Sequence, residues 1–458
     1  MASRGGSADD RVRAALEALP AGTSADARVT RSEWTTIRFA NGRIHQPMHE
    51  RTAHLSFRVA EASRLGTATT VDLSAAGIAA VVREARALAR VAPVEKSFLG
   101  FPTDGRPKPA SVPYSASTVR TSPEAATRIA ETILAAAASG APGGRTAGVV
   151  NVGGESLHVL NSTGLDRSTA TSAAHTNVLV DRPERDPPVS GWSEGAHWDV
   201  RRLAAERVGR EAAERVAAST PEAVAPGRYR VLLRAPAVSE LVSYLAFLGF
   251  GGHGEVEGWS CLRRQRGKRV APSEVDLRDD ARSPLTFPTA IDAEGVATRA
   301  TPLIERGIAR PVVTDVLTAG RLGRALSGHA LSPEAPSGDW GPIPSHLLLA
   351  RGDAREEELI RETRRGILVT RFHYVRVVDP GRSIITGMTR DGTYRIEHGE
   401  IVGPARNLRF TQSVLETIRD TELLGRELRF TGSERGGAAA TVPDLVSRSF
   451  RFTSATLF

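Results

Sequence analysis

Histidine is the residue type in this chain best suited to metal chemistry, and its spacing decides whether a zinc site can form. Eleven histidines are spread over 458 residues. His45 and His49 have the i, i+4 spacing of a helical zinc site, but Pro47 between them argues against a helix. His49-Glu50 also opens a His-Glu-x-x-x-His string that ends at His54. That string runs into an alternating strand, where a separation of five places the two imidazoles on opposite faces, so all three histidines are interpreted as structural or exposed.

A second candidate lies in the glycine-rich segment 249–254 and just beyond it. His253 and Glu255 place an imidazole and a carboxylate near each other in a predicted loop. Joined by a distant histidine, such as His329 or His373, they could form a divergent metal site. The segment follows a predicted helix and lacks the Lys-Ser/Thr of a phosphate-binding loop. His253 and Glu255 therefore remain the residual metal candidates, and no catalytic residue is assigned.

Two possible nucleophiles have little support from their surroundings. Gly191-Trp-Ser-Glu-Gly195 matches the Gly-x-Ser-x-Gly elbow of hydrolases, which needs a buried strand just before it. The preceding residues 186–190 include two prolines, so the pattern predicts a loop leading into the next helix. Cys261 precedes Leu262 and two arginines, which could lower its thiol pKa, but no histidine base is placed beside it.

Composition favours a cytoplasmic protein without a membrane partner. The single cysteine excludes an internal disulfide and fits a reducing compartment. The longest apolar run, near residues 241–252, is too short to cross a bilayer. Residues 1–10 contain no apolar core of a signal peptide.

The positive charge of the chain suggests nucleic acid at first sight. The formal net charge is +8 and the pI is near 10.2. Only three of the basic residues are lysines, however, and an arginine-rich, alanine- and glycine-rich background is typical of GC-rich coding bias. The one dense basic tract, residues 263–269, has no interleaved aromatic residue to stack on bases. A solvated loop or a contact with an acidic partner is the favoured interpretation.

The pattern of elements predicts an α+β fold with two domains. The N-terminal α/β domain, residues 8–220, is expected to contain a sheet and two long helices. One helix is capped near Asp72, and another opens with Ser122 as cap and Pro123 at its first position. A charged helix over 197–218 and a linker near 221–227 follow. Residues 228–458 are predicted to form a β-rich C-terminal domain.

The most informative stretch is residues 386–406, which reads as antiparallel strands joined by tight turns. Asp391-Gly392 is predicted to break the first pair of runs and His398-Gly399 the second. With the strand at 226–233, the segments 302–307 and 318–321, and the run at 365–370, this stretch resembles the TldD/PmbA metallopeptidase family. In the N-terminal half, the segments 39–43, 71–74 and 85–90 also resemble that family.

The resemblance implies a heterodimer that encloses a chamber. One subunit type carries a His-Glu-x-x-x-His helix and a cysteine near the C-terminus, and it cleaves unfolded or precursor peptides with a metal. The other type lacks these residues. A gapless comparison places Leu248 and Gly249 at the first histidine and the glutamate, and leaves only His253. Residues 432–436, where the cysteine is expected, contain none.

The resemblance therefore favours a TldE-like, PmbA-type subunit without a metal site of its own. Its expected partners are a TldD-type subunit carrying zinc and an unfolded or precursor peptide, which an exposed strand edge could bind by strand addition. Two alternatives remain open. One is a self-sufficient metallopeptidase with a divergent site, and the other is a nucleic-acid or gyrase-associated binding protein.

Overall fold

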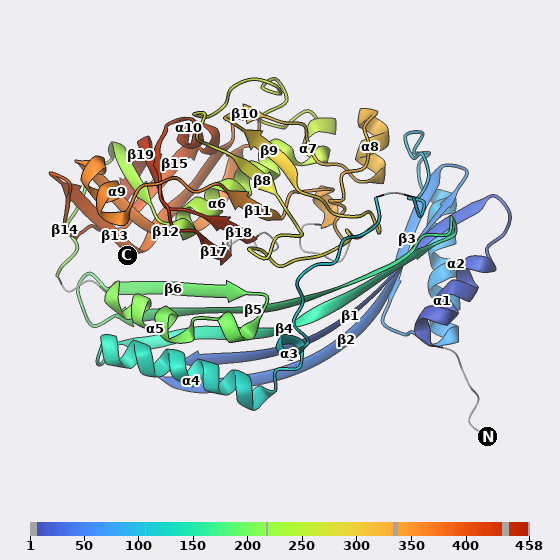
Figure 1. Ribbon diagram of the computed structural model, residues 1–458, viewed down its shortest axis with the longest axis horizontal. Helices are drawn as coiled ribbons and strands as arrows, with labels where there is room; N and C mark the ends of the chain where they lie inside the picture. The colour runs from blue at the N-terminus through green and yellow to red at the C-terminus, as the bar shows by residue number, and fades with distance from the viewer. Residues whose placement is uncertain (1–6, 106, 217–218, 333–337, 433–438, 457–458) are drawn as a thin grey trace.

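The structure, a computed structural model, describes residues 7–105, 107–216, 219–332, 338–432 and 439–456. The predicted α+β fold is confirmed, with one sheet in the N-terminal half and a β-rich C-terminal half (Figure 1). The first sheet is fully antiparallel, in the order β3-β2-β1-β4-β5-β6. Its strands are β1 (Thr23–Ala40), β2 (Arg43–Glu61), β3 (Arg64–Thr70), β4 (Arg145–Asn161), β5 (Asp166–Arg182) and β6 (Val189–His197).

Helices cover only one face of this sheet. Ala25, Ala27 and Val29 of β1 are buried in one core cluster, whose helical members come from α1 (Ala8–Glu17) and α2 (Ala75–Val91). Ile37 and Phe39, further along the strand, are buried in a second cluster with residues of α4 (Pro123–Gly140) and α5 (Ala205–Glu214). All five are odd-numbered residues of one strand, so both helical layers lie on the same face.

The opposite face of the sheet meets the C-terminal half of the chain. Arg58 of β2 pairs with Asp26 of β1 at 2.9 Å and with Glu294 at 3.0 Å. Burial raises the pKa of Glu294, against the attraction of Arg58. Because these three polar side chains are almost fully buried, their mutual bonding helps to fix where the two halves touch.

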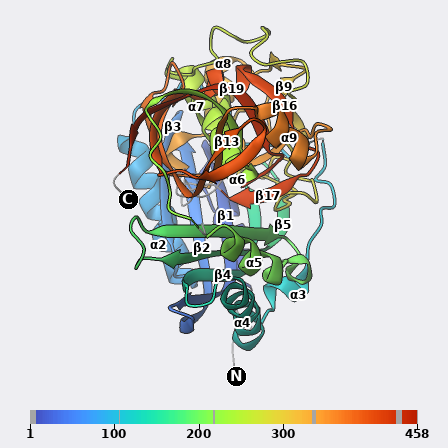
Figure 2. The ribbon, with the colours of Figure 1, turned by 90° about the vertical axis from the view of Figure 1, so that its left-hand side faces the viewer.

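The C-terminal half contains a closed barrel with five strands in its ring. Pairing runs from β12 through β7, β19, β15 and β13 back to β12, and Figure 2 shows the ring nearly end-on. Phe372, Phe410, Phe450 and Phe452 fill its interior. The barrel strands are β7 (Gly227–Leu233), β12 (Gly366–Asp379), β13 (Ile384–Glu397), β15 (Leu408–Ser413) and β19 (Leu445–Ala455), with β14 (Glu400–Pro404) and β16 (Thr421–Leu424) attached.

A second sheet of six strands lies beside the barrel, and α6 (Ala235–Leu245) packs between them. The sheet order is β10-β9-β8-β11-β18-β17, and α6 contacts β12 of the barrel as well as β17 and β18. Every residue of α6 except Pro236 is buried, as expected for a helix inside a core. The sheet strands are β8 (Leu277–Asp279), β9 (Thr301–Glu305), β10 (Ile308–Ala309), β11 (His346–Leu349), β17 (Arg429–Gly432) and β18 (Ala439–Val442).

The remaining elements are short. They are α3 (Ala116–Val119), η1 (Val200–Arg202), η2 (Ala246–Phe250), α7 (Gly252–Val256), α8 (Val316–Leu322), η3 (Gly338–Trp340), α9 (Glu356–Thr363) and α10 (Val414–Arg419). Within the described residues, no helix is both long and apolar enough to span a bilayer.

The helix predicted over 197–218 is wrong at its start. β6 continues to His197, and the Asp199 side chain accepts from the Arg201 backbone to cap a 3-10 turn. The α-helix begins only at Ala205. Residues 217–218 lie outside the described part. The division between residues 220 and 228 stays a prediction.

The loop predicted around Gly191–Gly195 is also wrong, because this segment is the middle of β6. Its inward positions are Gly191, Ser193 and Gly195, too small to give an apolar alternation. A Cβ on Gly191 would lie 2.1 Å from the Ala212 carbonyl oxygen of α5. Close packing of α5 therefore requires the small residues that concealed the strand.

The predicted stretch 386–406 is half right. His398 and Gly399 have positive φ and form the turn between β13 and β14. Asp391-Gly392 does not end a strand. Both residues have positive φ and bulge out of β13, which stays paired with β12 on either side. Residues typical of a turn here bulge one strand, and the Asp391 side chain stays buried, accepting from Ser190 and pairing with Arg371.

Candidate functional site

A cavity of about 420 Å3 lies between the two halves of the molecule. One wall is β6, the last strand of the N-terminal sheet, and the other is β17, the last strand of the second C-terminal sheet. Each of these strands pairs with one neighbour only and is an edge of its sheet. The lining residues are mostly polar and include Leu285 and Leu428.

An adjoining cavity of about 430 Å3 shares Arg215, Pro236 and Arg429 with the first. Glu211 of α5 lines it and pairs with Arg429 at 3.0 Å, Arg207 at 2.9 Å and Arg215 at 3.6 Å. Burial opposes ionisation of this carboxyl, but the three arginines prevail and lower its pKa to about 2. Glu211 is therefore charged at neutral pH and ties α5 to β17.

The other arginines of this adjoining cavity are held in place as well. Arg234 pairs with Asp444 at 2.7 Å and also with Glu356. Burial, together with repulsion from Arg429 and Arg234, lowers the pKa of Arg215. In both interdomain cavities the guanidinium groups thus have carboxylate partners within the protein.

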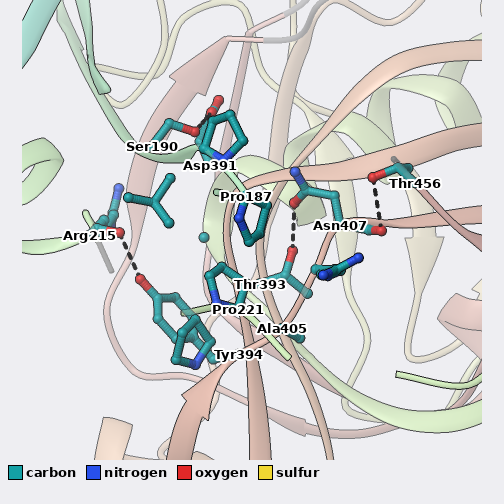
Figure 3. A pocket seen from close by; sticks show the side chains of 15 residues that line it. Pro187, Ser190, Arg215, Pro221, Asp391, Thr393, Tyr394, Ala405, Asn407 and Thr456 are labelled. Atoms are coloured by element: carbon teal, nitrogen blue, oxygen red, sulfur yellow. Dashed lines mark hydrogen bonds between the residues drawn. The ribbon is translucent and has the colours of Figure 1, made fainter. Parts of the chain in front are cut away.

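A third, much smaller space marks the joint beside these cavities. Figure 3 shows it between the start of β6 and the bulge in β13. The Ser190 hydroxyl donates to Asp391 at 2.5 Å, and the Tyr394 hydroxyl donates to the Arg215 carbonyl at 2.8 Å. At about 50 Å3 it has room for a few waters and none for a peptide side chain.

The residual metal candidates do not form a ligand set. Glu255 of α7 is paired with Arg266 at 3.1 Å. The ring of His253 lies 6.4 Å from that of Trp259, edge to face. The preceding η2 is a π-helical turn, in which Gly249 packs against Leu262.

The distant histidines lie elsewhere. His329 is buried and pairs with Asp279 at 3.2 Å, whereas His373 lies on barrel strand β12 beside Tyr374. Among the residues that the structure describes, no three His, Cys, Asp or Glu side chains gather closely enough to hold a metal ion.

The remaining sequence candidates have structural surroundings. His49 lies on β2 with its Nδ1 2.9 Å from the Thr35 hydroxyl, so the predicted strand is confirmed. Ser193 donates to Glu211 at 2.9 Å. Burial raises the pKa of Cys261 to about 12, against the attraction of Arg266, in keeping with the little support that the sequence gives this thiol as a nucleophile.

The basic tract 263–269 is partly tied inward. Arg266 donates to the Arg310 carbonyl and stacks over Phe250, with 5.1 Å from Cζ to the ring centre. Arg263, Arg264 and Arg269 are exposed. The tract is a turn surface, in keeping with the solvated interpretation.

Comparison with known sequences decides the family. The PmbA/TldA metallopeptidase C-terminal domain matches residues 226–454, half of the chain, and domain 1 of the same group matches residues 25–89. The chain belongs to the PmbA/TldD family. The predicted resemblance is confirmed.

Relatives and solved structures agree with that assignment. A metalloprotease of Methanothermobacter thermautotrophicus is 28% identical over 248 residues, 54% of this chain and 52% of that protein. The zinc metalloprotease TldD homolog of Saccharolobus solfataricus is 26% identical over 235 residues, 49% of each chain. The matches thus span about half the length of these curated relatives.

The fold resembles that of solved family structures over almost the whole chain. TldE from Thermococcus kodakarensis superposes with a TM-score of 0.86 at 21% identity, covering 98% of this chain and 100% of that one. A Thermotoga maritima protein gives 0.84 at 19% identity, covering 97% and 99%. At these identities the likeness concerns the fold alone.

Two segments that the family resemblance links to a metal site lie side by side in this fold: residues 239–244 of α6, and Gly432 at the end of β17. Ser239-Glu240-Leu-Val-Ser-Tyr244 of α6 has the spacing of His-Glu-x-x-x-His, with serine and tyrosine where that motif has histidines. The Ser239 hydroxyl donates to the Gly432 carbonyl of β17 at 3.2 Å. Gly432 is the first residue of the segment where the family cysteine is expected, and residues 433–436 lie outside the described part.

The gapless comparison had pointed to Leu248 and Gly249 instead. Those residues pack toward Cys261 and Leu262, whereas Ser239 touches β17. Residues 239–244 of helix α6 could not be found by the spacing of histidines, because they contain none. The signal that could have found them is the glutamate at the second position of the spacing.

The residues at the motif positions do not suit zinc. The Tyr244 hydroxyl donates to the Val375 carbonyl at 2.8 Å, and Ser239 donates to Gly432. Both side chains are almost completely buried. A neutral hydroxyl committed to a carbonyl is a poor ligand compared with imidazole, and a catalytic zinc needs about three protein ligands.

Proposed function

We propose that this chain is the non-catalytic subunit of a TldD/TldE-type heterodimer in the cytoplasm. In this proposal it shapes the peptide chamber and guides unfolded or precursor peptides to the metal of a TldD-type partner. The observation that carries the proposal is the 239–244 turn of α6. It has the family spacing, but Ser239 and Tyr244, at the two histidine positions, donate their hydroxyl groups to backbone carbonyls.

The interdomain cavities support a role with peptide. Two sheet edges, β6 and β17, face the first of these cavities from opposite sides. An extended peptide can hydrogen-bond to such an edge through its backbone, which makes binding tolerant of sequence. Arg429 of β17 pairs with Glu211 of α5, and Arg234 before α6 pairs with Asp444 between β18 and β19, so ion pairs brace the cavity walls.

Chemistry is assigned to the partner in this proposal. A zinc ion there would polarise the peptide carbonyl and activate water. This chain would supply the wall, the path and the exclusion of folded proteins. No step of the reaction is assigned to His253, Glu255 or Glu240.

Co-expression with a TldD-type subunit that carries His-Glu-x-x-x-His tests the proposal. We expect the two chains to copurify, and we expect unfolded casein to be cleaved only by the pair, with loss of activity in chelator. A matched partner in which the motif glutamate is replaced by glutamine should bind equally but cleave nothing. Chelator-sensitive cleavage by this chain alone would contradict the proposal.

A further inference from the structure

A third large cavity, of about 590 Å3, opens beside β8, β9 and β11 and is called here the outer cavity. Leu348 of β11 lies opposite Arg278 of β8 on the same face of the sheet, whereas Leu277, Ile304 and Leu349, which also border the cavity, are buried in the core. Leu285 and Leu428 stand at its border with exposed fractions of 45% and 36%. Large apolar side chains exposed beside a cavity indicate a binding surface.

Three arginines surround this apolar lining without partners of their own. Arg278, Arg306 and Arg351 are exposed, and in the described part of the chain no carboxylate lies within ion-pair distance of their guanidinium groups. The two acids of the lining are engaged elsewhere. Glu305 pairs with Arg310, and Asp276 accepts from the Arg306 backbone at 2.6 Å.

The outer cavity leads to the interdomain cavity. Leu285 and Leu428 line both, so they form the border between them. Residues 427–431, just before and within β17, continue from this border along the interdomain cavity. The two cavities therefore adjoin at Leu285 and Leu428, next to the start of β17.

We propose that the outer cavity binds an acidic segment of an extended peptide on its way into the interdomain cavity. Acidic side chains would pair with Arg278, Arg306 and Arg351, and apolar side chains between them would contact Leu285 and Leu428. This proposal rests on the proposed function for its peptide, but it adds a place and a charge preference. Several exposed guanidinium groups together can raise the affinity for an acidic peptide, and this affinity should fall as the salt concentration rises.

The lining favours peptide over nucleic acid. None of the residues that line the outer cavity is aromatic, so no side chain there can stack on a base. Its leucines would instead contact apolar side chains. An alternation of acidic and apolar residues therefore matches the lining better than a phosphate backbone does.

The test uses the purified full-length chain and a short fluorescein-labelled peptide in which glutamate and leucine alternate with serine. Fluorescence anisotropy should show binding that weakens as salt rises. The variant Arg278→Gln/Arg306→Gln/Arg351→Gln should bind about tenfold more weakly, because three exposed ion pairs are lost. A peptide with lysine in place of glutamate should bind poorly to the unaltered chain.

A matched control removes the same charge elsewhere. Arg409, Arg419 and Arg451 are exposed and do not line the outer cavity. Their triple replacement by glutamine should leave the affinity for the acidic peptide within about twofold of the original value, apart from a small long-range effect. Equal weakening in both variants would overturn the proposal, because attraction would then come from net charge.

Two further results would decide whether the outer cavity binds acidic peptide. Tighter binding of a single-stranded oligonucleotide, lost in the outer-cavity variant, would overturn the proposal in favour of nucleic acid. Because the assay needs no partner and no cleavage, its failure is separate from failure of the proposed function. A heterodimer that cleaves casein while both arginine variants bind the acidic peptide equally would leave the proposed function intact and remove only the outer cavity.

Discussion

The arginines of the interdomain cavities are paired with carboxylates of the protein, whereas those around the outer cavity are not, in the part of the chain that the structure describes. Arg429 and Arg215 share Glu211, and Arg234 is paired with Asp444. Around the outer cavity, Arg278 and Arg351 extend from strand and loop with no carboxylate at ion-pair distance among the described residues.

Burial explains the difference. A charge removed from water needs a partner, so Arg215 and Arg234, with side chains 21% and 18% exposed, are held by carboxylates, and the largely buried Glu211 is held by Arg429. An exposed guanidinium keeps its water and needs no partner in the folded chain. Its charge therefore remains available to a ligand. The net charge of +8 is informative only once the arginines are sorted in this way.

Removal of the shared carboxylate should have the largest effect. Glu211→Gln leaves three arginines facing one another, and we expect the free energy of unfolding to fall by about 3 kcal/mol. Urea unfolding measures it. Glu214→Gln, on the same helix but with a side chain 63% exposed, should change it by less than about 0.5 kcal/mol. Equal effects of the two substitutions would remove the distinction between braced and free charges.

The same carboxylate should make stability depend on acid. The pKa of Glu211 is lowered to about 2 in the folded chain, so its contribution is complete above its ordinary pKa near 4.5 and is lost as pH falls toward the folded value. The difference in unfolding free energy between the unaltered chain and Glu211→Gln should therefore shrink between about pH 5 and about pH 3. Urea titrations over that range would contradict the account if the difference stayed constant.

The apolar border of the outer cavity should contribute less. Leu285→Ser/Leu428→Ser removes two half-exposed side chains, and we expect about threefold weaker binding of the acidic peptide. Salt dependence should be unchanged, because the arginines remain. Anisotropy titrations at two salt concentrations separate the two contributions, and a steeper loss than in the arginine variant would reverse their predicted order.

The smallest effect is expected for stability in the outer-cavity variant. Since Arg278, Arg306 and Arg351 have no partners to lose, their replacement by glutamine should change the free energy of unfolding by less than about 0.5 kcal/mol. A loss comparable to that of Glu211→Gln would show that these arginines also brace the fold.

The sequence predicted those features that depend on residues close together in the chain, such as helix caps and strand alternation. Ser122 accepts from the Ala125 backbone and Pro123 opens α4, as predicted from the cap pattern alone. His49 and His54 lie on β2 because the alternation of that strand is visible in the sequence. The β-rich character of the C-terminal half was equally readable.

The sequence did not predict features that depend on packing against residues distant in the chain. The glycines and serine of β6 are small because α5 packs onto them, and no apolar alternation survives to mark the strand. The bulge at Asp391-Gly392 uses the residues of a turn. Which arginines are paired depends on residues more than a hundred positions away, as Glu211 and Arg429 illustrate, so it could not be predicted.

The zinc content of this chain tests the central claim most directly. After purification alone and in complex with a TldD-type partner, metal would be counted per polypeptide by mass spectrometry. We predict no stoichiometric zinc in the chain alone, and an unchanged amount in the complex when Ser239→Ala and Tyr244→Phe are introduced. Stoichiometric zinc in the chain alone, or its loss from the complex in that variant, would contradict a non-catalytic subunit.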